Sequence, residues 1–414
     1  MNGAVICADI GTSSLKTALV DTSGAVLFYV RIRFNGTGGA ERWYEAFTSA
    51  AAQAKTAARD GGCRVLGICV SGNGPTLAAC TGETLLWNET PAETGATLSG
   101  DTANRSLFIP RLTLFHSTYP AAWERSPYIF SGPEYLIWRL TGEPLTILPE
   151  SRYREAYWTE ESLAAARLEA EKLPPFVPPA HRAGFLSAQA ARQTGLPSDV
   201  PVFCGAPDFI VALIGTDTLR AGTVCDRAGS SEGINLCIAP HPASVWTPRQ
   251  LAPVRILPAV IPDLYNASIL IPDSGIRFSA LKKETAPDAS YENFVAELIA
   301  RPKRYAAAYA FLTETAAEVA NGVSLLFKLA RDAGCPVPSR IRTTGGQAKN
   351  GAWLQFKADA LGIPIEVTAC PDAELIGDAV LACTGLNIFA DIQEGAAALV
   401  RPHRVFEPHG AAAL

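Results

Sequence analysis

The chain has 414 residues, of which 48% are hydrophobic and 18% charged, and its formal net charge is −5. This length favours two or three domains of about 150 residues each. The 35 Lys and Arg residues are scattered along a slightly acidic chain. The composition therefore argues against a basic nucleic-acid surface.

No segment indicates export or a membrane. Asp9 interrupts the apolar N-terminal stretch without a basic region before it, and no apolar run approaches the roughly 18 residues that span a bilayer. The ten cysteines form no C-x-x-C pair and lie mostly in apolar runs, which is typical of buried thiols in a reducing compartment. The five histidines show no zinc-ligand spacing. We expect a cytoplasmic protein without disulfides or a zinc site.

The first predicted element is a hairpin at the N-terminus. Apolar residues 4–8 and 15–20 predict two strands, joined by a Gly-Thr-Ser turn. Gly11 permits a ligand to approach the backbone closely. Asp9 is an oxygen ligand of the kind that Mg²⁺ prefers, and Lys16 adds a positive charge, so the turn suits a nucleotide phosphate. A polar hairpin turn without a ligand is the alternative.

The rest of the chain alternates apolar strands with helices. Strands are predicted at residues 25–34, 64–70, 201–205, 341–344 and 363–368, with a further hairpin at 222–236. Helices are predicted at residues 45–60, 208–215, 305–332, 351–361 and 374–386, and over much of 107–142. This alternation implies parallel strand pairing in a mixed α/β fold. The second hairpin again has a glycine-and-hydroxyl turn, at Gly229-Ser230, which suggests an internal duplication.

Three segments together carry a resemblance to a known family. They are the Asp9–Lys16 turn, Gly205-Ala206-Pro207-Asp208, and Gly345–Gln355 followed by Asp359. Their order and spacing resemble the FGGY family of carbohydrate kinases, which phosphorylate sugars and polyols. Further matches are Glu134-Tyr135-Leu136, Arg139–Gly142, Thr194–Pro197 and Ile376–Ala379. The resemblance covers most of residues 4–240 and 305–410 and identifies the chain as a short, divergent member.

The resemblance implies an α/β fold with two ribonuclease H-like (actin-like ATPase) domains and a cleft between them. The expected domains are residues 1–218, which end with the catalytic Asp element, and residues 219–414, on the nucleotide side. Family members are usually longer than this chain. The missing part lies between about Ala289 and Tyr305, where a further strand and helix are expected to be absent, so we expect a shortened second domain.

The resemblance also assigns the site. It implies that Asp208 is the catalytic base, because an ionised carboxylate can accept the proton of an attacking hydroxyl. It implies that Asp9 holds Mg²⁺. Expected nucleotide and phosphate contacts are Thr12, Ser13, Lys16, Gly229, Ser230, Gly346 and Asn350. The alternatives are a helix N-cap for Asp208 and an ordinary turn at Gly345-Gly346.

The sugar-facing segments depart from the family pattern. Trp87-Asn88-Glu89-Thr90-Pro91 has Glu where the family has Asp and Pro where it has Arg, which removes a bidentate donor for hydroxyl groups. Asn73 and Glu134 also replace the usual residues of their motifs. Asn73, Glu89 and Glu134 remain candidate sugar contacts, and the alternative for each is a solvated loop residue.

The sequence therefore predicts a kinase that uses ATP and Mg²⁺ to phosphorylate a sugar or polyol, with no nucleic-acid or membrane partner. A homodimer is left open. The first alternative is a degenerate, non-catalytic kinase fold that binds nucleotide or sugar as a sensor. The second is an actin-like ATPase that hydrolyses ATP without an acceptor. P-loop and dinucleotide-binding glycine motifs are absent from the sequence.

Overall fold

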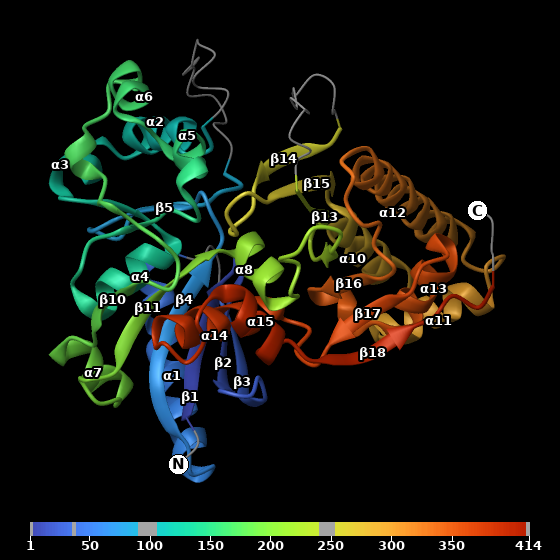
Figure 1. Ribbon diagram of the computed structural model, residues 1–414, viewed down its shortest axis with the longest axis horizontal. Coiled ribbons are helices and arrows are strands. Elements are labelled where there is room, and N and C mark those ends of the chain that lie inside the picture. The colour runs from blue at the N-terminus through green and yellow to red at the C-terminus, as the bar shows by residue number, and fades with distance from the viewer. Residues whose placement is uncertain (1–2, 35–38, 90–105, 240–252, 411–414) are drawn as a thin grey trace. The chain divides into compact units, whose positions relative to one another are not determined.

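A computed structural model describes residues 3–34, 39–89, 106–239 and 253–410. The chain divides into two compact units, each built on one large sheet (Figure 1). Unit 1 comprises Met1–Gly215 with Glu374–Leu399, and unit 2 comprises Thr216–Ala373 with Val400–Leu414. A domain boundary at residue 218 and a cleft between the domains stay predictions. Thr90-Pro91 of the sugar-facing motif lies outside the described residues.

The sheet of unit 1 has six strands in the order β10-β11-β4-β1-β2-β3. They are β1 (Gly3–Ile10), β2 (Ser14–Asp21), β3 (Val26–Arg33), β4 (Arg64–Gly72), β10 (Arg182–Phe185) and β11 (Pro201–Pro207). β1 pairs antiparallel with β2 and parallel with β4, and β4 pairs parallel with β11. The carboxyl ends of β1, β4 and β11 therefore lie at the same edge of the sheet, which is where open α/β sheets usually bind ligands.

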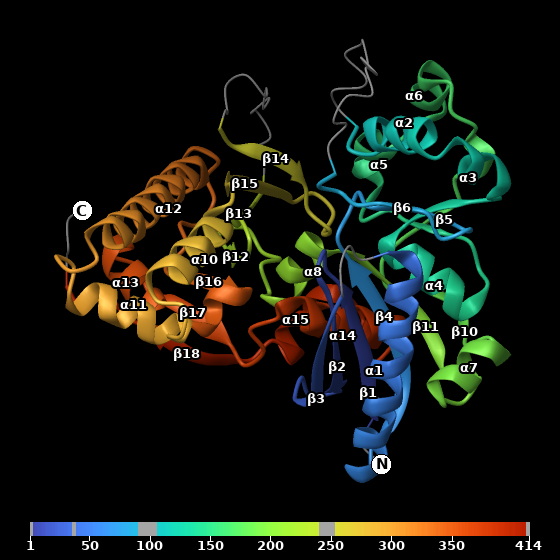
Figure 2. The same ribbon diagram turned by 180° about the vertical axis from the view of Figure 1, so that it is seen from behind.

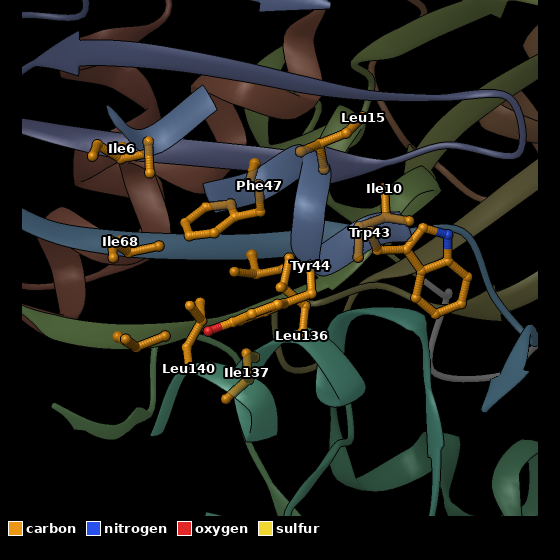
Figure 3. Packing of buried hydrophobic residues seen from close by; sticks show 14 of the residues in the cluster. Ile6, Ile10, Leu15, Trp43, Tyr44, Phe47, Ile68, Leu136, Ile137 and Leu140 are labelled. Atoms are coloured by element: carbon orange, nitrogen blue, oxygen red, sulfur yellow. The ribbon is translucent and has the colours of Figure 1, made fainter. Parts of the chain in front are cut away.

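Helices cover both faces of this sheet (Figures 1 and 2). α1 (Ala40–Asp60) and α4 (Gly132–Thr141) lie on one face, and α8 (Asp208–Gly215), α14 (Ala373–Gly385) and α15 (Ile392–Leu399) lie on the other. Figure 3 shows Tyr44 and Phe47 of α1 packed among Ile68 of β4 and Leu136 and Leu140 of α4. This packing gives the residues at the sheet edge a rigid support.

Smaller elements of unit 1 lie between β4 and β11 in the chain. The strands are β5 (Leu77–Ala79), β6 (Thr84–Leu85), β7 (Ile129–Ser131), β8 (Thr146–Ile147) and β9 (Phe176–Val177). The helices are α2 (Ile109–Thr118), α3 (Pro120–Arg125), η1 (Ser151–Tyr153), α5 (Arg154–Tyr157), α6 (Glu160–Ala166), η2 (Ala170–Lys172) and α7 (Ala188–Thr194). β6, β5 and β7 form a separate small sheet in that order, and β8 pairs with β9.

The sheet of unit 2 has seven strands in the order β14-β15-β13-β12-β16-β17-β18. They are β12 (Val224–Ala228), β13 (Glu232–Ile238), β14 (Arg255–Pro258), β15 (Tyr265–Ile271), β16 (Ile341–Thr344), β17 (Ile365–Thr368) and β18 (Pro402–Phe406). The helices are α10 (Ser274–Thr285), α11 (Tyr291–Ala300), α12 (Ala306–Asp332), η3 (Gly346–Lys349) and α13 (Gly351–Leu361). The long helix α12 packs Val319, Val323 and Leu326 against the sheet, at the helical spacing that the sequence predicts.

The two sheets repeat one topology. β1 and β12 each form an antiparallel hairpin with the next strand and pair on their other side with a parallel strand, β4 or β16. A second parallel strand follows, β11 or β17, and an antiparallel strand, β3 or β15, flanks each hairpin. The turns at Gly11–Ser13 and Gly229–Ser231 occupy the same place in this repeat. The match supports the internal duplication that the sequence suggested.

α1 is longer than predicted, because it begins at Ala40 rather than at Glu45. The extra turn contains Trp43 and Tyr44, whose exposed fractions are 1% and 4%. Aromatic residues have only moderate helix propensity, so the local sequence gives a weak signal there. Burial of the two large rings in the core outweighs that preference.

The expectation that residues 289–305 lack a helix is wrong, because α11 occupies Tyr291–Ala300. The Ser290 hydroxyl caps this helix by accepting a hydrogen bond from the Asn293 N–H at 3.1 Å. Phe294 and Leu298 lie one turn apart on its buried face. Because ten residues form this helix, the segment is ordinary folded structure, and the shortened second domain stays a prediction.

Two composition-based expectations can be compared with the structure. All ten cysteines are free thiols, each buried or half-buried, as predicted. Within the part of the chain that the structure describes, no helix is both long enough and apolar enough to cross a membrane.

We expect Phe47→Ala to lower the free energy of unfolding by about 3–5 kcal/mol. The Phe47 ring has an exposed fraction of 0% between α1 and the sheet, so its removal leaves a cavity. Denaturation in urea measures the change. Ser49→Ala, on the exposed side of the same helix, serves as the control and should shift stability by at most about 0.5 kcal/mol. Equal effects of the two substitutions would contradict the packing of α1.

Candidate functional site

Asp9 lies near the carboxyl end of β1, at the sheet edge where β4 and β11 also end. Its exposed fraction is 2%. Lys16 is its direct partner in the antiparallel register of β1 and β2, and the Lys16 Nζ lies 3.1 Å from Asp9 Oδ2. The same Nζ lies 3.6 Å from Glu374 Oε2 at the start of α14. The lysine thus neutralises part of a buried acidic cluster.

Asp208 begins α8 directly after β11, which places it at the same edge of the sheet as Asp9. Burial raises the pKa of Asp9 to about 6, although Lys16 lowers it. The negative charges of Glu374 and Asp208 add to the rise. The two carboxylates that the sequence singled out therefore lie at the same edge of the unit 1 sheet, and the charge of Asp208 acts on Asp9. Their joint role in one catalytic site stays a prediction.

Thr12 connects the first turn to two segments that are distant in sequence. Its hydroxyl accepts hydrogen bonds from the Asn73 amide at 3.1 Å and from the Trp87 indole N–H at 2.8 Å. Thr76 links both partners, because it donates to Asn73 Oδ1 at 3.0 Å and accepts from the Trp87 backbone N–H at 3.1 Å. Asn73, predicted as a sugar contact, therefore lies directly beside a predicted phosphate contact. Ser13 is exposed in the same turn.

Glu89 and Glu134, the other two predicted sugar contacts, use their carboxylates within the protein. Glu89 accepts a hydrogen bond from the Leu86 N–H at 3.1 Å. Glu134 is 3% exposed and accepts hydrogen bonds from the Ile147 N–H at 2.9 Å and from the Ser131 hydroxyl. Burial raises the pKa of Glu134 to about 7. These contacts favour a structural role for both residues, and a sugar contact stays a prediction.

The turn of unit 2 contains Gly229 and Ser230, which are both exposed. The start of α10 holds this turn from one side, since the N–H groups of Gly275 and Ile276 donate to the Ser230 carbonyl at 2.9 and 3.1 Å. Any side chain at Gly275 would collide with the Gly229 carbonyl, because an added Cβ would lie 2.0 Å from that oxygen. The turn thus presents its other groups to solvent from a fixed backbone.

The Gly345-Gly346 segment lies next to this turn. Gly345 has a φ of 95°, and an added Cβ would lie 2.6 Å from the Ala228 carbonyl oxygen, so both its conformation and its contact require glycine. Gly346 is exposed at the start of η3. Asn350 is 6% exposed and caps α13 by accepting from the Trp353 N–H at 3.1 Å. Its amide also donates to the Tyr291 carbonyl at 3.1 Å, so its role toward a nucleoside stays a prediction.

Asp9 could contribute to a metal site. Among the described residues, no group of three or more Asp, Glu, His or Cys side chains is placed to hold a metal ion. Asp9 Oδ1, however, is buried and accepts no hydrogen bond within the described structure. Mg²⁺ is usually held by one or two carboxylates together with waters and substrate phosphates. Asp9 therefore fits a Mg²⁺ ion that is shared with a bound phosphate.

The sequence analysis missed several charged or polar residues near these turns. Trp87 belongs to one of the motifs that depart from the family pattern, and only the structure reveals its hydrogen bond to the Thr12 hydroxyl. Asp378 is fully buried on α14, accepts a hydrogen bond from the Ser71 hydroxyl at 2.9 Å, and has a pKa well above its usual range because of burial. Lys357 is fully buried on α13. In the sequence, Asp378 and Lys357 each stand between apolar residues of a predicted helix. A charged residue at such a position is ordinarily expected to face solvent.

A family model and two sequence relatives all relate this chain to carbohydrate kinases. Residues 275–386 match the model of the C-terminal domain of the FGGY family of carbohydrate kinases. A xylulose kinase of Staphylococcus epidermidis is 23% identical over 98% of this chain and 92% of the relative. An autoinducer-2 kinase of Klebsiella pneumoniae is 24% identical over 75% of this chain and 66% of the relative.

Solved structures share the fold. The crystal structure of xylulose kinase from Rhodospirillum rubrum matches with a TM-score of 0.77 at 21% identity and covers 99% of this chain and 95% of that one. The Plasmodium falciparum glycerol kinase with ADP matches with a TM-score of 0.78 at 15% identity, over 99% and 94% of the two chains. The mixed α/β structure described above is therefore the fold of these kinases.

We expect Asp9 to make stability depend on pH between about 4 and 6. The pKa of Asp9 rises from 3.8 to about 6 on folding, so the folded protein binds more protons than the unfolded chain in this window. Its contribution to stability is present below the unfolded pKa and is lost as the pH rises. Chemical denaturation at several pH values should therefore show a decline up to about 3 kcal/mol larger in the native protein than in Asp9→Asn.

Asp60→Asn is the matched control, because the Asp60 side chain is 63% exposed on the same unit. This variant should keep the native pH dependence. Parallel stability curves for the native protein and Asp9→Asn would show that Asp9 is not held in a buried environment.

Proposed function

Because the chain belongs to the FGGY family of carbohydrate kinases, we propose that it transfers the terminal phosphoryl group of ATP to a hydroxyl of a sugar or related polyol. The observation that carries this proposal is the placement of Asp9 and Asp208 at the same edge of the unit 1 sheet, at the carboxyl ends of β1 and β11. One carboxylate suits a metal ion and the other a reacting hydroxyl. The related xylulose kinases and the autoinducer-2 kinases support the same reaction class.

Asp208 is the proposed general base. It is half-buried at the first position of a helix that packs on the sheet, so its carboxylate has little freedom to move. It would accept the proton of the acceptor hydroxyl as the oxygen attacks phosphorus. Phosphoryl transfer depends mainly on positioning and charge stabilisation, and a base of this kind contributes about 10²–10⁴ in rate.

Asp9, with its unused Oδ1, would hold Mg²⁺. When bound, the ion would neutralise charge on the phosphate oxygens. Lys16 would keep its ion pair with Asp9 Oδ2 and would offer positive charge to a phosphate oxygen. Thr12 and Ser13 would add hydroxyl and backbone N–H donors from the turn. Together these residues would orient the transferred group at the unit 1 edge.

Unit 2 supplies the proposed nucleotide contacts. The exposed turn at Gly229 and Ser230 would bind the phosphates through backbone N–H and hydroxyl donors, as turns with successive N–H groups commonly do. Gly346 would leave room for the adenosine to approach the backbone of η3. Asn350 would support this segment by fixing the start of α13, whether or not its amide reaches the nucleoside.

The acceptor would lie near Asn73 and Trp87. Asn73 donates to Thr12, so its position couples the acceptor end to the phosphate end. Trp87 is 48% exposed and offers an apolar ring beside the same hydroxyl. A cytoplasmic location and a homodimer also stay proposals.

The second candidate function is a kinase-fold sensor that binds nucleotide or sugar without catalysis. The contacts of Glu89 and Glu134 favour this alternative, because both carboxylates accept hydrogen bonds from backbone N–H groups of the protein and are therefore less available to a sugar. Retention of both Asp9 and Asp208 favours the kinase, since a pure binder does not need a base. ADP release with a panel of sugars and polyols, with and without acceptor, distinguishes a kinase from a sensor and from an ATPase.

We expect Asp208→Asn to lower acceptor-dependent ADP release by at least about 100-fold, because the amide cannot accept the hydroxyl proton. Nucleotide binding, measured by titration calorimetry, should be unchanged. Asp199→Asn, in an exposed loop of the same unit, is the control and should keep full activity. Turnover at the native rate in Asp208→Asn would remove this residue from the mechanism, and nucleotide binding without any acceptor-dependent ADP release would favour the sensor.

A further inference from the structure

A buried ionic cluster lies beneath the turn of unit 2. Lys357 on α13 has an exposed fraction of 0%, and its Nζ contacts Asp226 on β12 and Glu232 on β13. The side chains of the two acids are 3% and 0% exposed. β12 leads into the Gly229–Ser231 turn and Glu232 follows it directly, so the lysine ties together the two strands that carry the turn.

Stability alone does not account for this cluster. Removing charges from water is costly, and replacing a buried ionic group by apolar residues of similar volume is often neutral or stabilising. The position of the cluster points to a role in fixing the geometry of the backbone. It connects a helix to the two strands at the point where the backbone must turn sharply, and a specific ionic contact fixes geometry better than apolar packing does in several known systems.

The cluster of Lys357, Asp226 and Glu232 is electrically neutral when one of its two acids is protonated. Asp226 Oδ1 and Glu232 Oε2 are both buried without a hydrogen-bond partner in the described structure. Burial and the charge of Asp226 raise the pKa of Glu232 to about 8. Burial lowers the pKa of Lys357, but the two carboxylates outweigh this effect and the net pKa is raised. A proton shared between the two acids leaves one negative charge opposite the lysine, and the cluster is then neutral.

The cluster is also linked to the second nucleotide segment. The Lys357 Nζ lies 5.4 Å from the centroid of the Trp353 ring. The Trp353 indole N–H donates to Gln347 Oε1 at 2.7 Å, and the Gln347 amide donates to the Gly229 carbonyl at 3.4 Å. This chain of contacts reaches the turn from the η3 side, while α10 holds Ser230 from the other side.

We propose that Lys357, together with Asp226 and Glu232, is a positioning element that holds the Gly229–Ser231 turn in the shape that binds the phosphates of ATP. The inference rests on the proposed function and deepens it. Lys357 is fully buried, so it acts through the backbone of the turn and not by contact with the nucleotide. A neutral cluster also leaves no unpaired negative charge behind a turn that must attract a polyanion.

The proposal carries a pH dependence. The charged groups that act on Glu232 are Asp226 from β12 and Lys357 from α13. The neighbouring strands contribute Ile271 of β15, in register with Glu232, and Thr343 of β16, which donates to the Asp226 carbonyl. Neither of these side chains titrates. Loss of the Glu232 proton at alkaline pH would give the cluster a net negative charge, which repels the phosphates.

The test uses steady-state kinetics of the full chain with ATP and the acceptor found in the sugar panel. Lys357→Met should raise the KM for ATP by at least about tenfold while the KM for the acceptor stays unchanged. A role limited to global stability would leave both values near native. The double variant Asp226→Asn with Lys357→Met removes both charges of the pair. It replaces the single variant in this test if circular dichroism shows that Lys357→Met does not fold. It should show the same selective rise.

Glu232→Gln tests the protonation state. Its neutral amide imitates the protonated acid, so the KM for ATP should be near native at pH 7. Between pH 7 and 9 the native protein should show a rising KM for ATP, and Glu232→Gln should show a flat profile. An identical rise in both proteins would show that Glu232 is not the group that titrates and would overturn this part of the proposal.

Two further variants are the positive and the negative control for the change in the KM for ATP. Gly275→Ala places a Cβ 2.0 Å from the Gly229 carbonyl oxygen, so it displaces the turn directly and should raise the KM for ATP. Glu366→Gln removes a buried carboxylate that pairs with Arg340 and Arg342 at 2.7 Å, at the start of β16 and β17 and away from the turn. It should leave the KM for ATP unchanged.

The outcomes separate the inference from the proposed function. A folded Lys357→Met or double variant with a native KM for ATP overturns the positioning role, while acceptor phosphorylation by the native protein still stands. A native protein that neither binds nucleotide in calorimetry nor releases ADP overturns the proposed function, and the positioning role falls with it. A rise in the KM for ATP that is confined to the cluster variants and Gly275→Ala supports both.

Discussion

The pairing of a lysine amine with buried carboxylates at the base of a hairpin turn is the interaction on which both units depend. In unit 1 the lysine is Lys16, on the strand opposite Asp9. In unit 2 it is Lys357, which reaches Asp226 and Glu232 from a helix. Each turn ends a buried strand, so an acid placed there is removed from water and needs a partner. The partner also fixes the turn.

The two turns share a topology and differ in charge. Asp9 precedes Ile10-Gly11, and Arg227 precedes Ala228-Gly229, so the repeated position carries a carboxylate in unit 1 and a guanidinium in unit 2. A carboxylate suits a cation, and a guanidinium suits a phosphate. This difference agrees with the proposed division of roles, with the metal ion at the first turn and the nucleotide phosphates at the second. The position that matches Lys16 is Gly233, opposite Arg227 on β13, so unit 2 takes its lysine from α13 instead.

The sequence predicted the features that follow from local pattern, and missed those that depend on packing. Apolar runs ending at glycine turns gave the strands and the parallel order that brings Asp9 and Asp208 to one edge. α11 was missed because its polar residues, such as Glu292 and Asn293, weaken the apolar pattern. Lys357 was missed because a lysine in a helix ordinarily faces water. Its burial depends on two acids from strands more than a hundred residues earlier, which no local pattern reveals.

The sugar-facing segments depart most from the family motifs, so the resemblance says least about which residues contact the acceptor. The structure shows which of the candidate contacts are already held by the protein. Of the three candidate sugar contacts, Glu89 and Glu134 bind backbone N–H groups of their own unit. Glu134 is 3% exposed, and a buried carboxylate that satisfies a backbone donor is costly to replace. Glu89 is half-buried and makes the same kind of contact. Asn73 instead donates to the Thr12 hydroxyl and accepts from the Thr76 hydroxyl, so its amide lies beside a predicted phosphate contact. We therefore propose that selectivity for the acceptor rests more on Asn73 and the exposed Trp87 ring than on Glu89 and Glu134.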